Sequence, residues 1–253
     1  MLRLKKALHC LKQAPRAWND RIHTYFVENK YEQCPIEHTL YIKKRGGRIM
    51  LIALYVDDLM FMGNDAELIK NFKRTMEKEF KMTNLGHMRY FLGLEVKQLE
   101  TSIFVSQERY VEDILRKFKM ASCNLVSTPI EPGTTLSKFD GGDHVDANKY
   151  RSLVGSLRYL MSTRPNLLLS VGIVSRYKEE SSYTHWKALK RILRYVRGTT
   201  SLGLYYTRSN DYRLVGYSDN DWCGNVDDRK STSGYVTTTK SILDNTTKLW
   251  PKS

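Results

Sequence analysis

Residues 49–62 read IMLIALYVDDLMFM, an apolar run interrupted by two adjacent acids, Asp57 and Asp58. An unpaired buried carboxylate must be neutralised, paired or bound to a metal, so apolar packing alone does not account for the pair. The residues before the acids and the LMFM after them both read as strands, and Asp is a common turn residue. The stretch therefore predicts a tight antiparallel hairpin that carries two carboxylates at its tip.

The flanking segments predict further strands and two helices. HTLYIKK and RIMLIALYV are strand-like and are separated by residues 45–48 (RGGR), which is typical of another hairpin. Apolar residues at helical spacing predict one helix from Pro15 to about Asn29. A second helix is expected over NDAELIKNFKRTMEKEF, beginning with a capping box of Asn64 and Glu67 and burying one face against a sheet.

The rest of the chain continues this mixture of helices and strands. A stretch rich in Pro, Gly, Ser and Thr predicts a linker at 129–145, and the closing NTTKLWPKS shows little sign of structure. The remaining expected elements are a hairpin over 90–107, a helix over 108–120, helices over 146–162 and 183–197, and strands joined by turns over 201–240. This order predicts an α+β fold with an antiparallel sheet.

Charge favours a polyanionic partner. The chain has 253 residues and a formal net charge of +14, from 41 Lys and Arg against 27 Asp and Glu, and 41% of its residues are hydrophobic. It can therefore bury a core, and nucleic acid is the first candidate partner. The alternative is that the surplus charge only keeps the surface soluble.

Several classes of site and location are disfavoured. The four cysteines are far apart with no CxxC pair, and the six histidines form no HxxxH or HxxH pair, which argues against a zinc site or a disulfide framework. No apolar run is long enough to span a bilayer, and residues 1–20 lack the apolar core of a signal peptide. We expect an intracellular protein, cytoplasmic or nuclear, without a membrane partner.

One predicted helix carries a basic face. In HWKALKRILRYVRG the cations recur at steps of three and four: Lys187, Lys190, Arg191, Arg194 and Arg197. Such a stripe suits a row of phosphates, while an ordinary solvated helix face is the alternative. Trp18 and Trp186 are expected to pack rather than to stack on bases, because single aromatics at helical spacing usually do so.

Two neighbouring carboxylates at a strand turn form a hard-oxygen site of the kind that holds Mg²⁺ with phosphates and water. Two such ions activate an attacking hydroxyl and stabilise the leaving oxygen in phosphoryl transfer. The alternative is that Asp57 and Asp58 serve only the backbone of the turn. A further pair, Asp227 and Asp228, is expected to shape a turn rather than to bind metal, and Asp219 belongs to another acidic cluster near a strand end.

Eight blocks in order, from Leu4 to Tyr235, resemble the pol polyprotein of copia-type LTR retrotransposons. The blocks are LKKALHCLKQAPRAW (4–18), LYVDDLMFMG (54–63), FKMTNLGHMRYFLGLEV (80–96), SIFVSQERYVEDIL (102–115), YRSLVGSLRYL (150–160), TRPN (163–166), HWKALKRILRYVRGT (185–199) and GYSDNDWCGNVDDRKSTSGY (216–235). The resemblance implies a reverse transcriptase, or RNA-directed DNA polymerase, followed by the start of a ribonuclease H domain. Its implied partners are an RNA template, a DNA primer and deoxynucleoside triphosphates, with Mg²⁺ or Mn²⁺ as cofactor.

The resemblance also implies site residues. YVDD matches the palm motif whose first Asp binds metal, which assigns that role to Asp57 with Asp58 as its partner. LKQAPRAW matches the segment beside template and incoming nucleotide, which marks Gln13, Pro15 and Arg16. NLGHMRYFLGLEV resembles the end of the palm and the primer grip. GYSDNDW resembles the opening of the ribonuclease H domain, where Asp219 matches the first catalytic carboxylate.

The resemblance implies four segments along the chain. They are a truncated palm and thumb (1–128), the linker (129–145), connection helices (146–205) and an incomplete ribonuclease H-like sheet (206–253). The palm of this family uses another Asp on a strand upstream of LKQAPRAW, and its ribonuclease H uses acids downstream of SDNDW. Asn166 also stands where the family has the Asp of TRPD.

We therefore expect a fragment truncated at both ends, with little or no polymerase activity alone. The alternatives are a non-catalytic nucleic-acid-binding relic, a truncated gene model of an intact element, and a chain that forms no stable protein because its sheet exposes an apolar edge.

Overall fold

The computed structural model describes residues 14–140, 142–207, 214–220, 223–239 and 247–251. For 214–215, 219–220, 236–239 and 247–251 it describes the backbone alone. The chain divides into two compact units, one formed by residues 1–88 and 243–253 and the other by residues 89–242. Within the described residues the expected α+β class with antiparallel sheets is confirmed.

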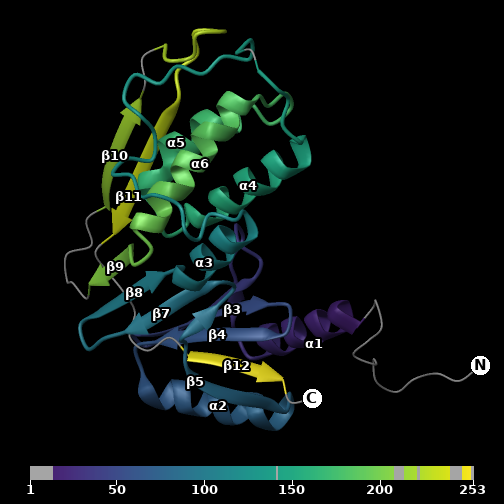
Figure 1. The fold of residues 1–253 in the computed structure, drawn as a ribbon. Helices are drawn as coiled ribbons and strands as arrows, with labels where there is room; N and C mark the ends of the chain where they lie inside the picture. Colours follow the sequence, from purple (N-terminus) through teal and green to yellow (C-terminus); the bar gives the residue numbers. More distant parts are fainter. Residues whose placement is uncertain (1–13, 141, 208–213, 221–222, 240–246, 252–253) are drawn as a thin grey trace, which may run out of the picture. The chain divides into compact units, whose positions relative to one another are not determined.

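The first unit is a six-stranded antiparallel sheet with two helices (Figure 1). The strand order is β1-β2-β3-β4-β12-β5. The strands are β1 (Glu32–Gln33), β2 (Leu40–Arg45), β3 (Arg48–Tyr55), β4 (Asp58–Gly63), β5 (Met82–His87) and β12 (Thr247–Pro251), and the helices are α1 (Ala14–Glu28) and α2 (Ala66–Glu79). Both predicted hairpins, β2–β3 and β3–β4, are confirmed.

Both helices cover the same face of this sheet. Cross-strand partners on β3 and β4, such as Ile52 opposite Phe61, are buried in one core cluster with Phe26 of α1 and Phe72 of α2. The rings of Phe26 and Phe72 lie 6.4 Å apart, and that of Phe72 lies 5.1 Å from Phe61. The alternation along β3 therefore orients the strand, because every second side chain enters the core.

Two expectations about this unit are wrong. The N-cap of α2 is Asp65, whose carboxylate accepts the Leu68 N–H at 2.7 Å, and not Asn64. Asn64 instead accepts the Ile49 N–H at 2.8 Å and donates to the Gly47 carbonyl at 3.1 Å. The closing residues also form a strand, since β12 pairs with both β4 and β5.

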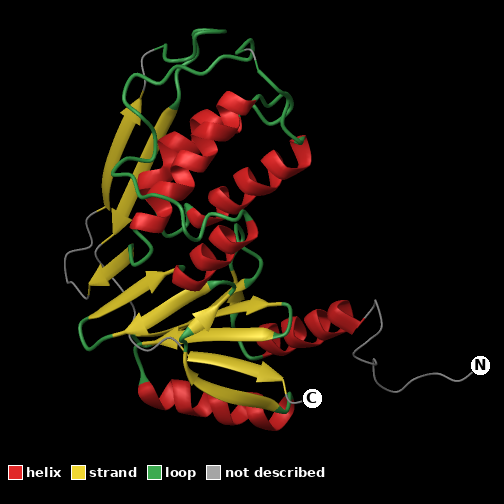
Figure 2. Cartoon of the chain, in the orientation of Figure 1, coloured by secondary structure: helices red, strands yellow, loops and turns green. Residues whose placement is uncertain are grey.

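The second unit combines a helical bundle with two antiparallel sheets (Figure 2). One sheet has the order β6-β7-β8-β9, and β10 pairs with β11 in the other. The bounds are β6 (Tyr90–Phe91), β7 (Leu94–Gln98), β8 (Ser102–Ser106), β9 (Gly203–Thr207), β10 (Leu214–Asn220), β11 (Ser233–Thr239), α3 (Glu108–Lys117), α4 (Ala147–Leu160), a 3₁₀ turn (Pro165–Leu167), α5 (Leu168–Ser175) and α6 (Tyr183–Gly198). The expected hairpin and helices are present, whereas α5 was not anticipated.

A buried arginine binds the C-terminal end of α6. Arg164, from the TRPN stretch, is 1% exposed and donates to the carbonyl of Thr199 at 2.8 Å and to its hydroxyl at 2.5 Å. Thr199 is the C-cap of α6, so the guanidinium sits at the negative end of that helix. Asn166 donates to the Tyr195 hydroxyl at 2.6 Å. An Asp at position 166 would accept a hydrogen bond from the same hydroxyl, so either residue suits the contact.

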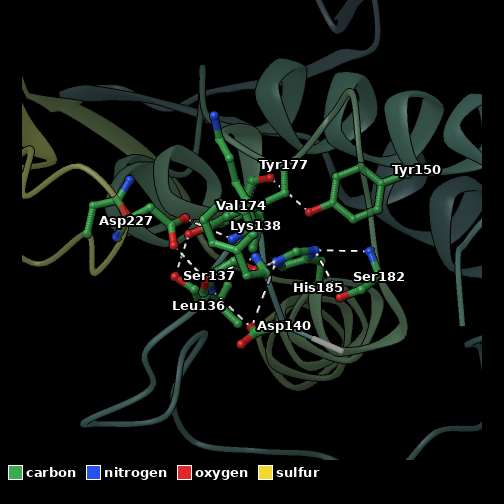
Figure 3. A network of polar contacts seen from close by, with 12 residues as sticks. Leu136, Ser137, Lys138, Asp140, Tyr150, Val174, Tyr177, Ser182, His185 and Asp227 are labelled. Carbon is green, nitrogen blue, oxygen red and sulfur yellow. Dashed lines mark hydrogen bonds and ion pairs between the residues drawn. The ribbon is translucent and has the colours of Figure 1, made fainter. Parts of the chain in front are cut away.

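The stretch predicted as a linker lies within the second unit. Leu136 is buried, and its carbonyl accepts the Tyr177 hydroxyl at 2.7 Å. Next to it, Asp227 accepts the Ser137 hydroxyl at 2.5 Å and the Lys138 N–H at 2.8 Å (Figure 3). These contacts hold the middle of the stretch against the bundle. The predicted domain boundaries refer to family segments rather than to compact units, and they stay a prediction.

His185 joins this stretch to the start of α6. Its Nδ1 accepts the Ser182 N–H at 3.0 Å, so the proton lies on Nε2, which donates to the Ser137 carbonyl at 3.0 Å (Figure 3). The ring is fully buried and stacks on Tyr177 with centroids 4.0 Å apart. Burial lowers the pKa of His185, and this outweighs the opposing effects of the Ser137 carbonyl, Asp140 and Asp227. The neutral imidazole is therefore built into the fold.

We expect the protein to lose stability as the pH falls below about 6.5, the ordinary pKa of histidine. Because the folded state holds the pKa of His185 lower, the unfolded chain takes up the proton first, so the stabilisation is complete above that pH and is lost below it. Thermal melts by circular dichroism between about pH 7.5 and 5.5 measure this. His185→Gln keeps a donor and an acceptor but does not titrate, so its melting temperature should fall less over the same range. Equal slopes for both proteins would contradict the assignment.

Candidate functional site

The two acids lie at the tip of the β3–β4 hairpin, as predicted. Tyr55 pairs with Asp58, which leaves Val56 and Asp57 as the two turn residues. Asp58 is 7% exposed and Asp57 is half-buried. One carboxylate is thus enclosed at the end of a core strand, while the adjacent one has access to solvent.

The backbone of this turn is strained. Val56 has φ 53°, in the left-handed region, although its side chain is β-branched and 57% exposed. Such a conformation costs roughly 1–2 kcal/mol for an L-residue, and a β-branched residue rarely adopts it. Strain of this kind persists only where neighbouring contacts fix the backbone, and it concentrates at functional sites.

The contact that fixes the turn comes from α1. The indole Nε1 of Trp18 donates to the carbonyl of Val56 at 2.9 Å, while the indole ring packs edge-on against Phe80, with centroids 5.4 Å apart. Arg21, one turn further along α1, donates to the Glu79 carbonyl at 3.2 Å and lies over the Phe80 ring. The end of LKQAPRAW is therefore bonded directly to the YVDD turn, and Trp18 packs as expected.

The other residues singled out in LKQAPRAW lie at the start of α1 or before it. Pro15 and Arg16 are exposed in its first turn, within one turn of Trp18. Gln13 lies outside the described residues. A contact of these three residues with template or nucleotide stays a prediction.

The basic face of α6 is confirmed as a face, but its arginines contact a neighbouring segment of the same unit. Arg191 donates to the Thr128 hydroxyl at 3.1 Å and lies 3.5 Å from the Glu131 carboxylate. Arg194 donates to the Asn124 carbonyl at 3.0 Å, and Arg197 donates to that of Cys123. These arginines hold residues 123–131 against the helix.

The lysines of the basic face of α6 have different surroundings from its arginines. Lys187 is exposed, and Lys190 lies over the ring of Trp186 at 5.9 Å from its centroid. Trp186 is buried, so its predicted packing role is confirmed. Phosphate binding by Lys187, Lys190, Arg191 and Arg194 stays a prediction.

The later acids fall into two groups. Asp219 lies on β10 opposite Gly234 of β11, where the structure describes the backbone alone. Asp228 shapes its turn through hydrogen bonds from the backbone and ammonium of Lys230, whereas the Asp227 carboxylate bonds Ser137 and Lys138 of a distant stretch. These hydrogen bonds lower the pKa of both carboxyls. The expected turn-shaping role fits Asp228, while the side chain of Asp227 makes a tertiary contact instead.

A divalent metal suits the β3–β4 turn in chemistry, because two carboxylates at a turn offer the hard oxygen ligands that Mg²⁺ and Mn²⁺ prefer. Among the described residues, no three His, Cys, Asp or Glu side chains gather where they could hold an ion. Within the described chain, the turn therefore supplies two of the oxygen ligands that such an ion would need.

No helix in the described part of the chain is long and apolar enough to cross a membrane.

Comparisons with known proteins agree on one family. The profile described as "Reverse transcriptase (RNA-dependent DNA polymerase)" matches residues 1–132. The chain is 38% identical over 234 residues to the retrovirus-related Pol polyprotein from transposon RE1 of Arabidopsis thaliana, covering 92% of this chain and 16% of that protein. It is 37% identical over 246 residues to the Pol polyprotein from transposon TNT 1-94 of Nicotiana tabacum, covering 93% of this chain and 18% of that protein.

A shorter relative is matched over most of its length. An uncharacterized mitochondrial protein of Arabidopsis thaliana is 36% identical over 188 residues, which cover 74% of this chain and 78% of that protein. The chain thus spans less than a fifth of the two polyproteins but most of this shorter protein. No solved structure gives a significant match.

We expect Trp18→Phe to destabilise the protein by about 1 kcal/mol, because it removes the N–H that bonds the Val56 carbonyl and keeps an aromatic ring against Phe80. Urea unfolding followed by circular dichroism measures the loss. For comparison, Tyr25→Phe also keeps a ring on Phe80 and leaves the turn contact intact, but it removes a hydroxyl that interacts with Thr75. Unfolding of Trp18→Phe at the same urea concentration as the parent chain would show that the hydrogen bond contributes nothing.

Replacing Val56 with Asn should stabilise the protein by about 1 kcal/mol, since Asn tolerates the left-handed region far better than a β-branched residue does. Val27→Asn is the matched control, because Val27 is similarly exposed at 53% but helical, and Val and Asn have similar helix propensities. Urea midpoints of both variants measure the difference. A decrease in stability at position 56 would show that the turn is not strained as described.

Proposed function

Because the chain belongs to the reverse transcriptase (RNA-dependent DNA polymerase) family, as a domain of the kind found in transposon Pol polyproteins, we propose that its β3–β4 turn binds the divalent metal ions of DNA synthesis. The single observation that carries the proposal is the YVDD turn, in which adjacent carboxylates follow a buried strand. The substrates would be an RNA template, a DNA primer and deoxynucleoside triphosphates. Asp57 and Asp58 would hold the metal ions, whose chemistry there would be activation of the primer hydroxyl and neutralisation of charge on the leaving phosphate.

The two acids have different tasks in this proposal. Asp57 is the half-buried member, so it is the ligand that meets a metal bound with substrate, and Asp58 supports it from within the core. Trp18 acts as a positioning residue, because its hydrogen bond to Val56 holds the backbone that presents Asp57. Pro15 and Arg16 lie one helical turn before Trp18 and are proposed to face the template or the nucleotide.

The remaining family assignments extend the proposal along the chain. The first unit corresponds to part of the palm, and α3 with the preceding hairpin corresponds to the thumb and primer grip. The helices α4 to α6 correspond to the connection, with Lys187 and Lys190 as its phosphate contacts. The pair β10–β11 corresponds to the opening of a ribonuclease H domain, with Asp219 as its first carboxylate.

A second candidate function is nucleic-acid binding without catalysis. It is favoured by the formal net charge of +14, which suits a nucleic-acid backbone whether or not the turn holds metal. The loss of one metal ligand or stabilising group costs several powers of ten in rate, so a turn that positions its metals poorly would leave weak primer extension at most.

Primer extension on an RNA template with Mg²⁺ or Mn²⁺, run beside Asp57→Asn, separates the two functions. A polymerase should lose at least about 100-fold in rate when Asp57 becomes Asn, since the variant removes a charged metal ligand. Asp143→Asn, at an exposed position in the stretch predicted as a linker, is the control and should extend like the parent chain. Template binding without extension by the parent or either variant would favour the non-catalytic function.

A further inference from the structure

A basic pocket lies in the first unit, between the tip of the β2–β3 hairpin and the first turns of α2. It has a volume of about 540 Å³. The described residues that line it are Lys43, Arg45, Gly46, Arg48, Glu67, Leu68 and Asn71. Three cations thus face one acid within this described lining, to which neither the YVDD turn nor the described part of α1 contributes.

Strand register brings the three cations together. Arg45 and Arg48 are direct partners across the hairpin, and Lys43 lies two residues before Arg45, so all three share one face of the sheet. Like charges placed directly opposite one another destabilise a strand pair. The repulsion is relieved if an anion lies between them, which is the arrangement that an anion-binding site requires.

The nearby acids neutralise this charge only in part. Arg48 lies 3.1 Å from the Asp65 carboxylate, which also accepts the Leu68 N–H as the cap of α2. Lys43 lies over the Tyr31 ring at 4.5 Å from its centroid. Burial, followed by the charges of Arg45 and Lys30, lowers the pKa of Lys43.

The pocket is also held in shape before any ligand arrives. Gly46 and Gly47, with φ 54° and 78°, form the tight turn, and Asn64 bonds both the Gly47 carbonyl and the Ile49 N–H. On the helix side, the Asn71 side-chain oxygen accepts a hydrogen bond from Arg74 at 2.7 Å. A preformed site loses less entropy on binding than a flexible cluster of side chains.

We propose that this pocket binds phosphate groups of a nucleic-acid backbone, as a second contact remote from the carboxylate turn. The eight residues of β3 separate the two places by roughly 25 Å at about 3.3 Å per residue. Arg45 and Arg48 bind phosphate oxygens in bidentate fashion, and Lys43 adds a point charge. Contacts of this type fix the position of a strand without reading its sequence. The inference rests on the proposed function in taking nucleic acid as the partner.

The test is the salt dependence of binding to a fluorescently labelled single-stranded RNA, measured by anisotropy without divalent metal or nucleotides. The variant K43Q/R45Q removes two of the pocket cations, and the control K70Q/K78Q removes equal charge from exposed positions of α2 that do not line the pocket. We expect the pocket variant to bind roughly tenfold more weakly and the slope of log affinity against log salt to flatten by about 1.4, or roughly 0.7 per contact. Equal effects in both double variants would overturn the proposal.

Glu67→Gln gives a test in the opposite direction, because it removes the acid that lines the pocket and should tighten RNA binding. Unchanged or weaker binding by this folded variant would overturn the proposal even if K43Q/R45Q fails to fold.

A competition experiment identifies the class of ligand. Unlabelled RNA should displace the probe, whereas equal displacement by inorganic triphosphate or by polyglutamate would point to a free polyphosphate or an acidic protein and overturn it. The assay contains neither divalent metal nor nucleotides, so its outcome does not depend on whether the chain extends a primer.

Discussion

The hydrogen bond from Trp18 to the Val56 carbonyl is the contact on which the arrangement of the candidate site depends. A two-residue turn between β3 and β4 brings Asp57 to the hairpin tip, but it does so with Val56 in a conformation that the residue itself disfavours. A backbone in that conformation must be held by neighbouring contacts. The Trp18 indole provides one of them, and because Trp18 also packs on Phe80 at the end of α2, the position of the turn is fixed relative to both helices of its unit.

Many features of the first unit could be predicted from the local sequence. The pair Gly46-Gly47 predicted a hairpin because both residues adopt positive φ without steric cost, and they do so here. The acids at 57 and 58 were placed at a turn because an apolar strand has no other position for them, and the register agrees. The helical spacing of residues on α2 and α6 was likewise sufficient to predict both helices, whereas the alternating burial along β3 is not visible in its continuous apolar run. The resemblance to a polymerase family was confirmed by comparison, whereas the roles of the site residues remain proposals.

Other features depend on tertiary contacts that local patterns do not encode. Asn64 and Asp65 are both good helix caps, and only the position of the β2–β3 hairpin decides that Asn64 bonds Gly47 and Asp65 caps α2. The helical spacing of the basic residues on α6 located their face but did not show that Arg191 and Arg194 hold a loop. The positive φ of Val56 could not be predicted from the sequence, because a β-branched side chain favours negative φ.

The strand β12 joins two strands of the first unit through main-chain hydrogen bonds. It pairs on one side with β4, where Leu249 lies opposite Leu59, and on the other with β5. Ladder hydrogen bonds use main-chain groups that every residue except proline supplies as donors, so this pairing depends on the extended backbone of residues 247–251. The strand that begins with Asp58 is thereby joined to a segment almost 190 residues further along the chain, and the sheet that carries the carboxylate pair is completed only when these distant parts of the sequence meet.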